Sequence, residues 1–315
     1  MTESKGIVLV TGASGFVGRH VAPALARAGW SVRAAVRSPK GLEGEVVVGS
    51  IGPDTAWEAA LDGVDAVVHL AARVHHPREE HAGELYRNVN TAGTLHLAHS
   101  AATAGVRRFV FLSTALVHGS SNEGRAPFSE EDTLTPRGVY GMSKAAAEAG
   151  LRILARDSDM EISVIRPPLV YGAGAKGNFA LLTRAVRLGL PLPLAAIRNR
   201  RAFLSVQNLS SFILRRLAVA DPASNFETFL VADNEQVSTP ELVERLARAS
   251  GKSPRLFGVS PELLGRLLGL VGRQDTHHSL FGSFELNVSK AIATGWQPEV
   301  SLDEGLRLAL AAQEA

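Results

Sequence analysis

A glycine-rich turn near the start of the chain constrains its fold more than any other stretch. The sequence VLVTGASGFVG places an apolar run at residues 8–10 directly before Gly12, Gly15 and Gly18. Gly12 permits a tight turn, Gly15 lets the backbone approach a pyrophosphate, and Gly18 lets a following helix pack on the strand. The pattern predicts a buried strand, a phosphate-binding turn and a helix whose N-terminus faces a dinucleotide.

Short apolar runs alternate with helix-like segments through the first half of the chain. Strands that are apolar along their whole length are typical of a parallel sheet covered by helices on both faces. The expected fold class is therefore α/β, a doubly wound parallel sheet of the Rossmann type. The strand-like runs are residues 6–10, 31–36, 45–48, 66–70, 108–112 and 161–165, and the helix-like segments are residues 17–28, 55–61, 91–104 and 144–156.

The pattern changes after about residue 170, where loops containing Gly and Pro separate shorter helices. We expect residues 1–170 to form the dinucleotide-binding domain and residues 171–315 to form a smaller, mixed α/β substrate-binding region. A strand-like run at residues 228–231 suggests that a segment near 200–232 returns to the main sheet. Ligands of such sheets bind beyond the carboxyl ends of the strands, so the C-terminal region is expected to close over a substrate.

Composition excludes several classes of partner and site. The chain has 315 residues, a net charge of +2 and no basic run interleaved with aromatic residues, so no nucleic-acid partner is expected. It has no Cys, which excludes disulfides, thiolate catalysis and cysteine metal sites. The pairs at 75–76 and 277–278 are the only adjacent His residues and lack the spacing of a zinc helix, so no metal is expected.

Neither the start of the chain nor its most apolar late run predicts a membrane association. The first residues, MTESK, lack the apolar region of a signal peptide, and we expect a cytoplasmic protein. The run at 263–271 contains Arg266 and is shorter than the roughly 20 residues that span a bilayer. We interpret that run as a packed helix.

Tyr140 and Lys144 are the strongest candidates for catalysis. Residues four apart share one face of a helix, and Pro136 suits the first turn of such a helix. A nearby ammonium lowers the pKa of a phenol and makes it a usable proton donor. The alternative is a chance surface pair. Ser113 and Thr114 follow the apolar run at 108–112, where their hydroxyls either contact a substrate or merely end the strand.

Five motifs together resemble the extended short-chain dehydrogenase/reductase family, in its nucleotide-sugar branch. They are TGASGFVG, HLAA at 69–72, NTAGT at 90–94, FLSTALVHG and VYGMSK, and the resemblance covers nearly the whole chain. It implies that Tyr140 donates the proton, Lys144 also grips the nicotinamide ribose, and Thr114 hydrogen-bonds the reacting oxygen, with Ser113 as second choice. The cofactor contacts that it implies are Gly12, Ser14, Gly15, Phe16, Val17, Gly18, Arg37, Ser50, Ile51, Leu70, Ala71, Ala72, Lys144 and Pro167.

The later segments RPPLVYGAGAKGNF and GLPLPLAAIRNRRAFLSVQNL resemble epimerases and 4-ketoreductases that act on UDP-linked hexoses. In those enzymes an Asn that opens a helix and an Arg on a following strand hold the diphosphate, and Asn178 and Arg201 match these positions. Arg273 is a further candidate phosphate ligand, while Thr114 and Tyr140 contact the sugar. The alternative for Arg201 is a solvated charge beside Arg198 and Arg200.

The end of the second predicted strand bears on the choice of cofactor. NAD-binding domains usually place Asp or Glu there to hydrogen-bond the ribose, whereas this chain has Val36 and Arg37. Arg37, with Arg33 or Lys40, could pair with the 2′-phosphate, which favours NADP(H) over NAD(H). Ser50 also replaces an acid that frequently contacts adenine in the family.

These observations favour an NADPH-dependent reductase that acts on the C4 ketone of a UDP-linked deoxyhexulose, of the UDP-2-acetamido-2,6-dideoxy-4-hexulose type, for surface polysaccharide synthesis. The alternative is a UDP-hexose 4-epimerase with tightly bound NAD. A third hypothesis is a non-catalytic NADP-sensing regulator, although such relatives commonly lose the Tyr and Lys pair. Small residues in the segments 91–104 and 144–156 suggest a homodimer, or alternatively helices packed on the sheet.

Overall fold

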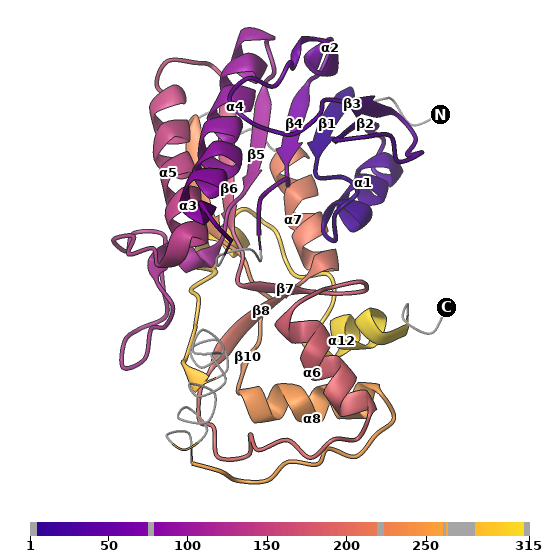
Figure 1. The fold of residues 1–315 in the computed structure, drawn as a ribbon, viewed down its shortest axis with the longest axis vertical. Coiled ribbons are helices and arrows are strands. Elements are labelled where there is room, and N and C mark those ends of the chain that lie inside the picture. The colour runs from indigo at the N-terminus through magenta and orange to yellow at the C-terminus, as the bar shows by residue number, and fades with distance from the viewer. Residues whose placement is uncertain (1–4, 75–78, 219–223, 261–262, 264–280, 312–315) are drawn as a thin grey trace. The chain divides into compact units, whose positions relative to one another are not determined.

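The computed structural model describes residues 5–74, 79–218, 224–260, 263 and 281–311. The chain divides into two compact units (Figure 1). Unit 1 comprises Met1–His118, Thr133–Pro167 and Ser210–Phe229, and unit 2 comprises Gly119–Asp132, Pro168–Leu209 and Leu230–Ala315. The chain therefore passes between the units several times. The sequence instead predicts two consecutive segments, 1–170 and 171–315.

Unit 1 is built on a seven-stranded sheet with the strand order β3-β2-β1-β4-β5-β6-β9. The paired strands from β3 to β6 are all parallel, as expected for strands that are apolar along their length. The strand order reverses direction between β1 and β4, where a doubly wound sheet opens its ligand crevice. The strands are β1 (Ile7–Thr11), β2 (Ser31–Val36), β3 (Glu45–Val47), β4 (Ala66–His69), β5 (Arg108–Leu112), β6 (Glu161–Arg166) and β9 (Phe226–Leu230).

Helices cover both faces of this sheet (Figure 1), so the prediction of a doubly wound α/β fold is confirmed. One face carries α2, α4 and α5, and the other carries α1 and the Ser210–Ala218 part of α7. A π-helical turn, η1, leads directly into α4. The helical elements are α1 (Gly18–Arg27), α2 (Glu58–Leu61), α3 (Ala82–Tyr86), η1 (Arg87–Ala92), α4 (Gly93–Thr103), η2 (Ala115–His118), α5 (Gly138–Leu154) and α7 (Val206–Ala218).

Small side chains allow α4 and α5 to approach each other and the sheet closely. Ala98, Ala101 and Ala147 are fully buried beside the strand residues Phe109 and Phe111. A Cβ atom at Gly150 of α5 would lie 2.5 Å from Leu95 Cδ2 of α4, so a larger residue there would require the Leu95 side chain to move. The small residues of these helices thus pack within unit 1. This agrees with the alternative interpretation of the sequence, in which the helices pack on the sheet.

The helix that carries Tyr140 and Lys144 begins between the two starts that the sequence suggests, which are Pro136 and the helix-like segment at 144–156. α5 starts at Gly138 rather than near residue 144, and Arg137 precedes it in an extended conformation. The prediction that Pro136 lies in the first helical turn is wrong, because Pro136 precedes the helix by two residues. Arg137 has an extended backbone conformation, so the helix cannot include it and begins at the next residue, Gly138.

Unit 2 contains a mixed three-stranded sheet in the order β10-β8-β7, in which β7 and β8 are parallel and β8 and β10 antiparallel. Asp233 organises its interior, since this carboxylate accepts hydrogen bonds from Tyr171 Oη at 2.7 Å and Asn208 Nδ2 at 2.7 Å. The elements are β7 (Leu169–Tyr171), α6 (Asn178–Arg187), β8 (Arg201–Ser205), β10 (Gln236–Val237), α8 (Thr239–Ala249), α11 (Ser289–Ala293) and α12 (Leu302–Ala311).

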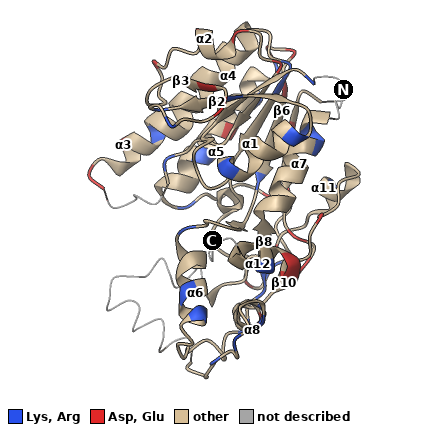
Figure 2. Cartoon of the chain, turned by 90° about the vertical axis from the view of Figure 1, so that its right-hand side faces the viewer, with Lys and Arg blue, Asp and Glu red and all other residues tan. Residues whose placement is uncertain are grey.

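Charged residues are scattered over many elements (Figure 2). Two ion pairs nonetheless lie in the interior of unit 1. Both partners are buried in the Arg166–Glu148 pair, whereas Glu227 is half-buried in its pair with Arg216. Among the residues that the structure describes, no helix combines the length and apolar character needed to cross a bilayer. The run at 263–271 lies outside the described residues apart from Leu263.

Candidate active site

The predicted cofactor and catalytic residues of unit 1 follow the carboxyl ends of parallel strands. Because these ends share one edge of the sheet, the structure brings the residues to that edge. In strand order they are Gly12 to Gly18 after β1, Arg37 after β2, Ser50 and Ile51 after β3, Leu70 to Ala72 after β4, Ser113 and Thr114 after β5, and Pro167 after β6.

The glycine turn has the close approaches that a dinucleotide site needs. A Cβ atom at Gly12, where φ is +69°, would lie 2.8 Å from the backbone nitrogen of Ala71. A Cβ atom at Gly18 would lie 2.2 Å from the carbonyl oxygen of Gly12, so side chains at these positions would push the turn apart. No side chain caps the N-terminus of α1 at Val17, and the Arg19 and His20 amides donate to the carbonyl oxygens of Gly15 and Val17 within the turn. The turn therefore fits a bound pyrophosphate.

The structure separates the three basic residues that were candidates for a 2′-phosphate. Arg33 is engaged, because its Nη1 donates to the carbonyl oxygens of Ala60 at 3.0 Å and Asp62 at 2.7 Å. One nitrogen of its guanidinium is therefore already used, and its role toward a 2′-phosphate stays a prediction. Arg37 and Lys40 are both exposed after β2, with the Lys40 amide bound to the Glu45 carboxylate at 2.9 Å. Arg37 and Lys40 therefore stay candidates for contact with a ribose substituent.

Tyr140 lies in the first turn of α5, and its ring meets the Tyr86 ring edge-on at 6.4 Å between centroids. Burial raises the pKa of Tyr140 above its ordinary value, and Tyr86 adds to the rise. The expected lowering of this pKa by Lys144 is thus wrong for the protein alone. The rise comes first from desolvation, because burial disfavours the charged phenolate, and then from the neighbouring Tyr86.

Lys144 is almost completely buried one helical turn beyond Tyr140. Its Nζ donates to the carbonyl oxygen of Leu112 at 2.8 Å and lies 4.3 Å from the centre of the Phe111 ring. Burial lowers the pKa of Lys144 from 10.5 to about 7, although the Glu148 carboxylate acts in the opposite direction. The Lys144 side chain is therefore held at the carboxyl end of β5.

Thr114 and Ser113 have different surroundings. Thr114 Oγ1 accepts a hydrogen bond from the Leu116 amide at 3.2 Å, so its own proton can be donated to a substrate oxygen. Ser113 Oγ instead donates to the Glu148 carboxylate in a short hydrogen bond. This difference supports Thr114 as the hydroxyl that contacts substrate and Ser113 as a structural neighbour.

A buried ion pair behind the catalytic helix was missed in the sequence. Glu148 and Arg166 are both less than 4% exposed, and Arg166 Nη2 donates to Glu148 Oε2 at 2.6 Å. His118 completes the group, with its Nε2 3.1 Å from Arg166 Nη1. The available signal was Glu148 itself, a charged residue four positions after Lys144 on the same face of an Ala-rich helix.

The predicted diphosphate ligands belong to unit 2. Asn178 opens α6 and Arg201 opens β8, as the resemblance requires. Arg201 Nη1 donates to the carbonyl oxygen of Gly282 at 2.6 Å, and burial lowers the pKa of Arg201 to about 10. The interpretation of Arg201 as a solvated charge therefore loses support. Arg273 lies outside the described residues, as do the His pairs at 75–76 and 277–278.

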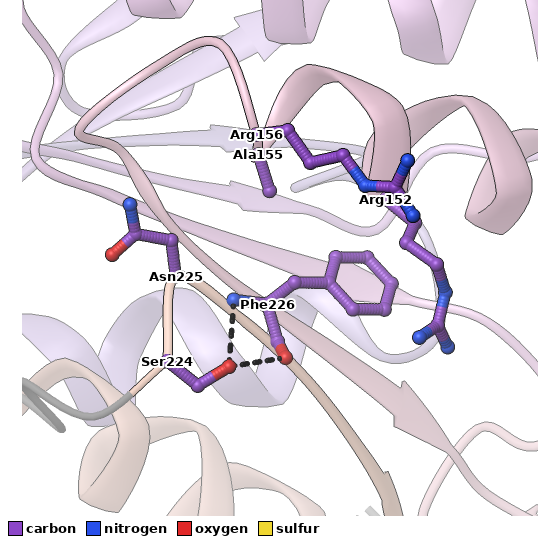
Figure 3. Close-up of a pocket in the computed structure, with 6 residues that line it drawn as sticks. All are labelled: Arg152, Ala155, Arg156, Ser224, Asn225 and Phe226. Atoms are coloured by element: carbon purple, nitrogen blue, oxygen red, sulfur yellow. Dashed lines mark hydrogen bonds between the residues drawn. The ribbon is translucent and has the colours of Figure 1, made fainter.

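A pocket of about 280 Å³ at the far end of α5 from Tyr140 is a separate feature (Figure 3). Arg152, Arg156 and Phe226 are among the residues that line it (Figure 3). Arg152 packs over the Phe226 ring at 4.5 Å, which uses its guanidinium within unit 1. Within the part of the chain that the structure describes, no group of His, Cys, Asp or Glu could hold a metal ion.

Replacing Lys144 tests the energetic consequence of its burial. Between about pH 7 and pH 10.5 the unfolded chain binds more protons at this residue than the folded chain, so wild-type stability should rise with pH. Lys144→Met removes the charge, and we expect the free energy of unfolding at pH 7 to increase by about 1–3 kcal/mol after the lost Leu112 bond is counted. The gain should fall toward zero near pH 10.

Urea unfolding of cofactor-stripped protein at several pH values measures this effect. Lys176→Met, which removes an exposed ammonium, should show no comparable dependence on pH. A Lys144→Met variant that is less stable than wild type by the same amount at every pH would contradict the expectation.

Comparison with known proteins agrees with this geometry. The chain matches the model of the NAD dependent epimerase/dehydratase family over residues 8–232. It is 39% identical to UDP-glucose 4-epimerase of Vibrio cholerae over 308 residues, which cover 95% of this chain and 93% of that protein. It is 27% identical to GDP-6-deoxy-D-mannose reductase of Pseudomonas aeruginosa, with 98% and 97% covered.

Solved structures share the fold across nearly the whole chain. MoeE5 in complex with UDP-glucose and NAD matches with a TM-score of 0.79 and 25% identity, covering 98% of this chain and 99% of that one. Other structures of this fold contain NADPH or NAD, so both nicotinamide cofactors are consistent with it. With its glycine turn, its parallel sheet and the family match over most of its length, this chain belongs to the NAD dependent epimerase/dehydratase family.

Proposed function

We propose that this protein is a UDP-hexose 4-epimerase, which inverts the configuration at C4 of a UDP-linked sugar such as UDP-glucose. The observation that carries this proposal is the 39% identity to a UDP-glucose 4-epimerase over 95% of the chain. Tyr140, Lys144 and Thr114 at the carboxyl edge of the unit 1 sheet are consistent with it. This order reverses the one favoured by the sequence, in which the reductase stood first.

The protein's own groups would manage the proton and the orientation of the sugar. A bound nicotinamide supplies the site that accepts a hydride from C4 and returns it. Tyr140 Oη would take the proton of the C4 hydroxyl as the ketone forms and return it after the ketone presents its other face. Thr114 Oγ1 would donate to the same oxygen, and the Lys144 ammonium would stabilise the phenolate form of Tyr140.

The diphosphate of the substrate would be held by unit 2. The N-terminus of α6 at Asn178 offers backbone amides to an anion, and the Arg201 guanidinium can bind two phosphate oxygens at once. Arg273 stays a candidate ligand in this proposal. The identity of the hexose depends on single contacts to its C2 and C6 substituents.

A second candidate is the NADPH-dependent 4-ketoreductase of a UDP-linked deoxyhexulose. The observation that favours it is the exposed Arg37 at the end of β2, where a ribose-binding acid would otherwise stand. Arg33 contributes less to this choice than Arg37, because its Nη1 already donates to two carbonyl oxygens. A non-catalytic NADP sensor is less consistent with the chain, because it retains both Tyr140 and Lys144.

The two enzymes make opposite demands on the cofactor. An epimerase should convert UDP-glucose to its C4 epimer without added cofactor, and denaturing the purified protein should release bound NAD in a near-stoichiometric amount. Proton NMR of the sugar nucleotides measures the first result and chromatography of the released nucleotide the second. Consumption of NADPH with a UDP-linked 4-ketohexose, without epimerisation, would instead establish the reductase.

Inactivity with every UDP-hexose and 4-ketohexose, combined with tight NADP binding, would overturn both enzyme proposals in favour of the sensor. A homodimer in the cytoplasm stays part of the proposal. The exposed Met142 and Ile153 of α5, 59% and 61% accessible, support an interface on that helix.

A further inference from the structure

A chain of buried hydrogen bonds begins at the glycine turn of unit 1. The amide of Ala71 donates to Thr11 Oγ1 at 3.2 Å, and Thr11 Oγ1 lies 2.7 Å from His69 Nδ1. His69 Nε2 lies 2.9 Å from Thr94 Oγ1, which donates to the carbonyl oxygen of Asn90 at 2.8 Å. The side chains of Thr11, His69, Thr94 and Asn90 are all buried. Thr11 and His69 are partners in the register of β1 and β4, so the sheet itself aligns them.

The positions of the protons in this series of hydrogen bonds follow from the Asn90 carbonyl at its end. The Asn90 carbonyl can only accept, so the single proton of Thr94 Oγ1 points toward it and Thr94 must accept from His69 Nε2–H. His69 Nδ1 is then unprotonated and accepts the proton of Thr11 Oγ1. Burial, together with the nearby charge of Lys144, lowers the pKa of His69 to about 3, so the ring stays neutral.

The same Asn90 continues the connection to the catalytic helix. Its side chain accepts from the Arg73 amide at 2.7 Å, and its Nδ2 donates to Ser143 Oγ at 3.0 Å. Ser143 Oγ donates to the carbonyl oxygen of Tyr140 at 2.8 Å, and Thr91 Oγ1 donates to the Ser143 carbonyl at 2.8 Å. The first turn of α5 is therefore tied to the π-helical turn η1 and, through it, to the end of β4.

We infer that His69, held as the neutral Nε2–H tautomer, is a positioning residue. It keeps the cofactor-binding turn in a fixed position relative to α5, the helix that carries Tyr140. The inference rests on the proposed function, because it assumes that the turn binds the cofactor and that Tyr140 transfers the proton. At the turn, these hydrogen bonds hold the Ala71 amide in place. The nitrogen of this amide leaves no room for a side chain at Gly12. At the helix, the hydrogen bonds fix the backbone of Tyr140.

A purely structural role would make a different prediction. If these bonds only satisfied buried polar groups, their loss would reduce stability and leave binding and turnover unchanged. A positioning role requires that removing one hydrogen bond in the middle of the series affects both the cofactor-binding turn and the first turn of α5. Thr94 is the place to cut, because it joins the His69 ring to Asn90 while touching neither the turn nor Tyr140.

The test compares three variants of the full-length protein. Thr94→Val removes the hydroxyl and keeps the shape, Thr94→Ser restores a hydroxyl, and Ser163→Ala removes an equally buried hydroxyl of unit 1 that binds Arg216 Nε at 3.0 Å instead. We expect Thr94→Val to weaken cofactor binding and to lower kcat by about tenfold each, because the net effect of one lost hydrogen bond would be felt at both ends of the hydrogen-bond chain. Thr94→Ser should recover most of both, and Ser163→Ala should lose stability only.

Nitrogen NMR of the imidazole tests the tautomer in the wild-type protein without any turnover. His69 should show a protonated Nε2 and an unprotonated Nδ1, unchanged between about pH 5 and pH 8 where an ordinary His titrates. The inference is overturned if His69 carries its proton on Nδ1 or titrates in that range. It is also overturned if Thr94→Val binds cofactor as tightly as Ser163→Ala does. Weaker cofactor binding by Thr94→Val, in a protein that turns over no UDP-sugar, would uphold the positioning of the turn and reject the proposed function.

Discussion

Tyr140→Phe is expected to lower kcat with the sugar nucleotide by about 10²–10⁴-fold, because it removes the proton-transferring hydroxyl and keeps the ring. The edge-on contact with Tyr86 should survive, since it depends on the rings and not on the hydroxyl. Cofactor affinity should stay close to that of wild type. Steady-state kinetics and cofactor titration by fluorescence measure the two results separately.

Tyr86→Phe is the matched control for this substitution. It removes the hydroxyl of the neighbouring tyrosine, which is almost fully buried, and should keep kcat within a few-fold of wild type. Retention of most activity in Tyr140→Phe would show that another group moves the proton. Equal losses in both variants would indicate that the pair supports the packing of α3 against α5 rather than the reaction.

Glu148→Gln is expected to reduce the free energy of unfolding by about 3–5 kcal/mol, because it leaves Arg166 charged and buried without a counter-ion. The pair joins α5 to β6 through bonds from Arg166 Nη2 and Nε to Glu148 Oε2, at 2.6 and 3.1 Å. The variant also removes the carboxylate that opposes the lowering of the Lys144 pKa. Urea unfolding measures the loss of stability, and the pH profile of kcat should report a further shift of Lys144.

Two further variants separate charge burial from loss of a contact. The double variant Glu148→Leu with Arg166→Leu removes both charges and should recover much of the lost stability, as buried pairs replaced by apolar residues often do. Glu304→Gln, which breaks the exposed pair with Arg307, should leave stability unchanged. A Glu148→Gln protein as stable as wild type would mean that water reaches Arg166 in solution.

The local patterns of the sequence predict much of this protein because they depend on neighbouring residues. The apolar runs at 31–36 and 108–112 coincide with β2 and β5, and Tyr140 and Lys144 share a face of α5 because both lie on one helix. The strands β7 and β10 were missed, since runs of three and two residues show no period. The start of α5 was also misplaced, because the glycine at 138 gave no helical signal.

Sequence alone determined the doubly wound sheet, the glycine turn and the residue types available for proton transfer, since each is encoded within one turn, strand or helix. Tertiary structure decided what these groups experience. It desolvated the half-buried Tyr140 and raised its pKa, bound Arg33 Nη1 to two carbonyl oxygens, and bound the Ser113 hydroxyl to the Glu148 carboxylate. Desolvation and long-range hydrogen bonds set these outcomes, and both depend on residues far away in the chain, such as Arg166 beside Glu148 and His69 beside Thr11.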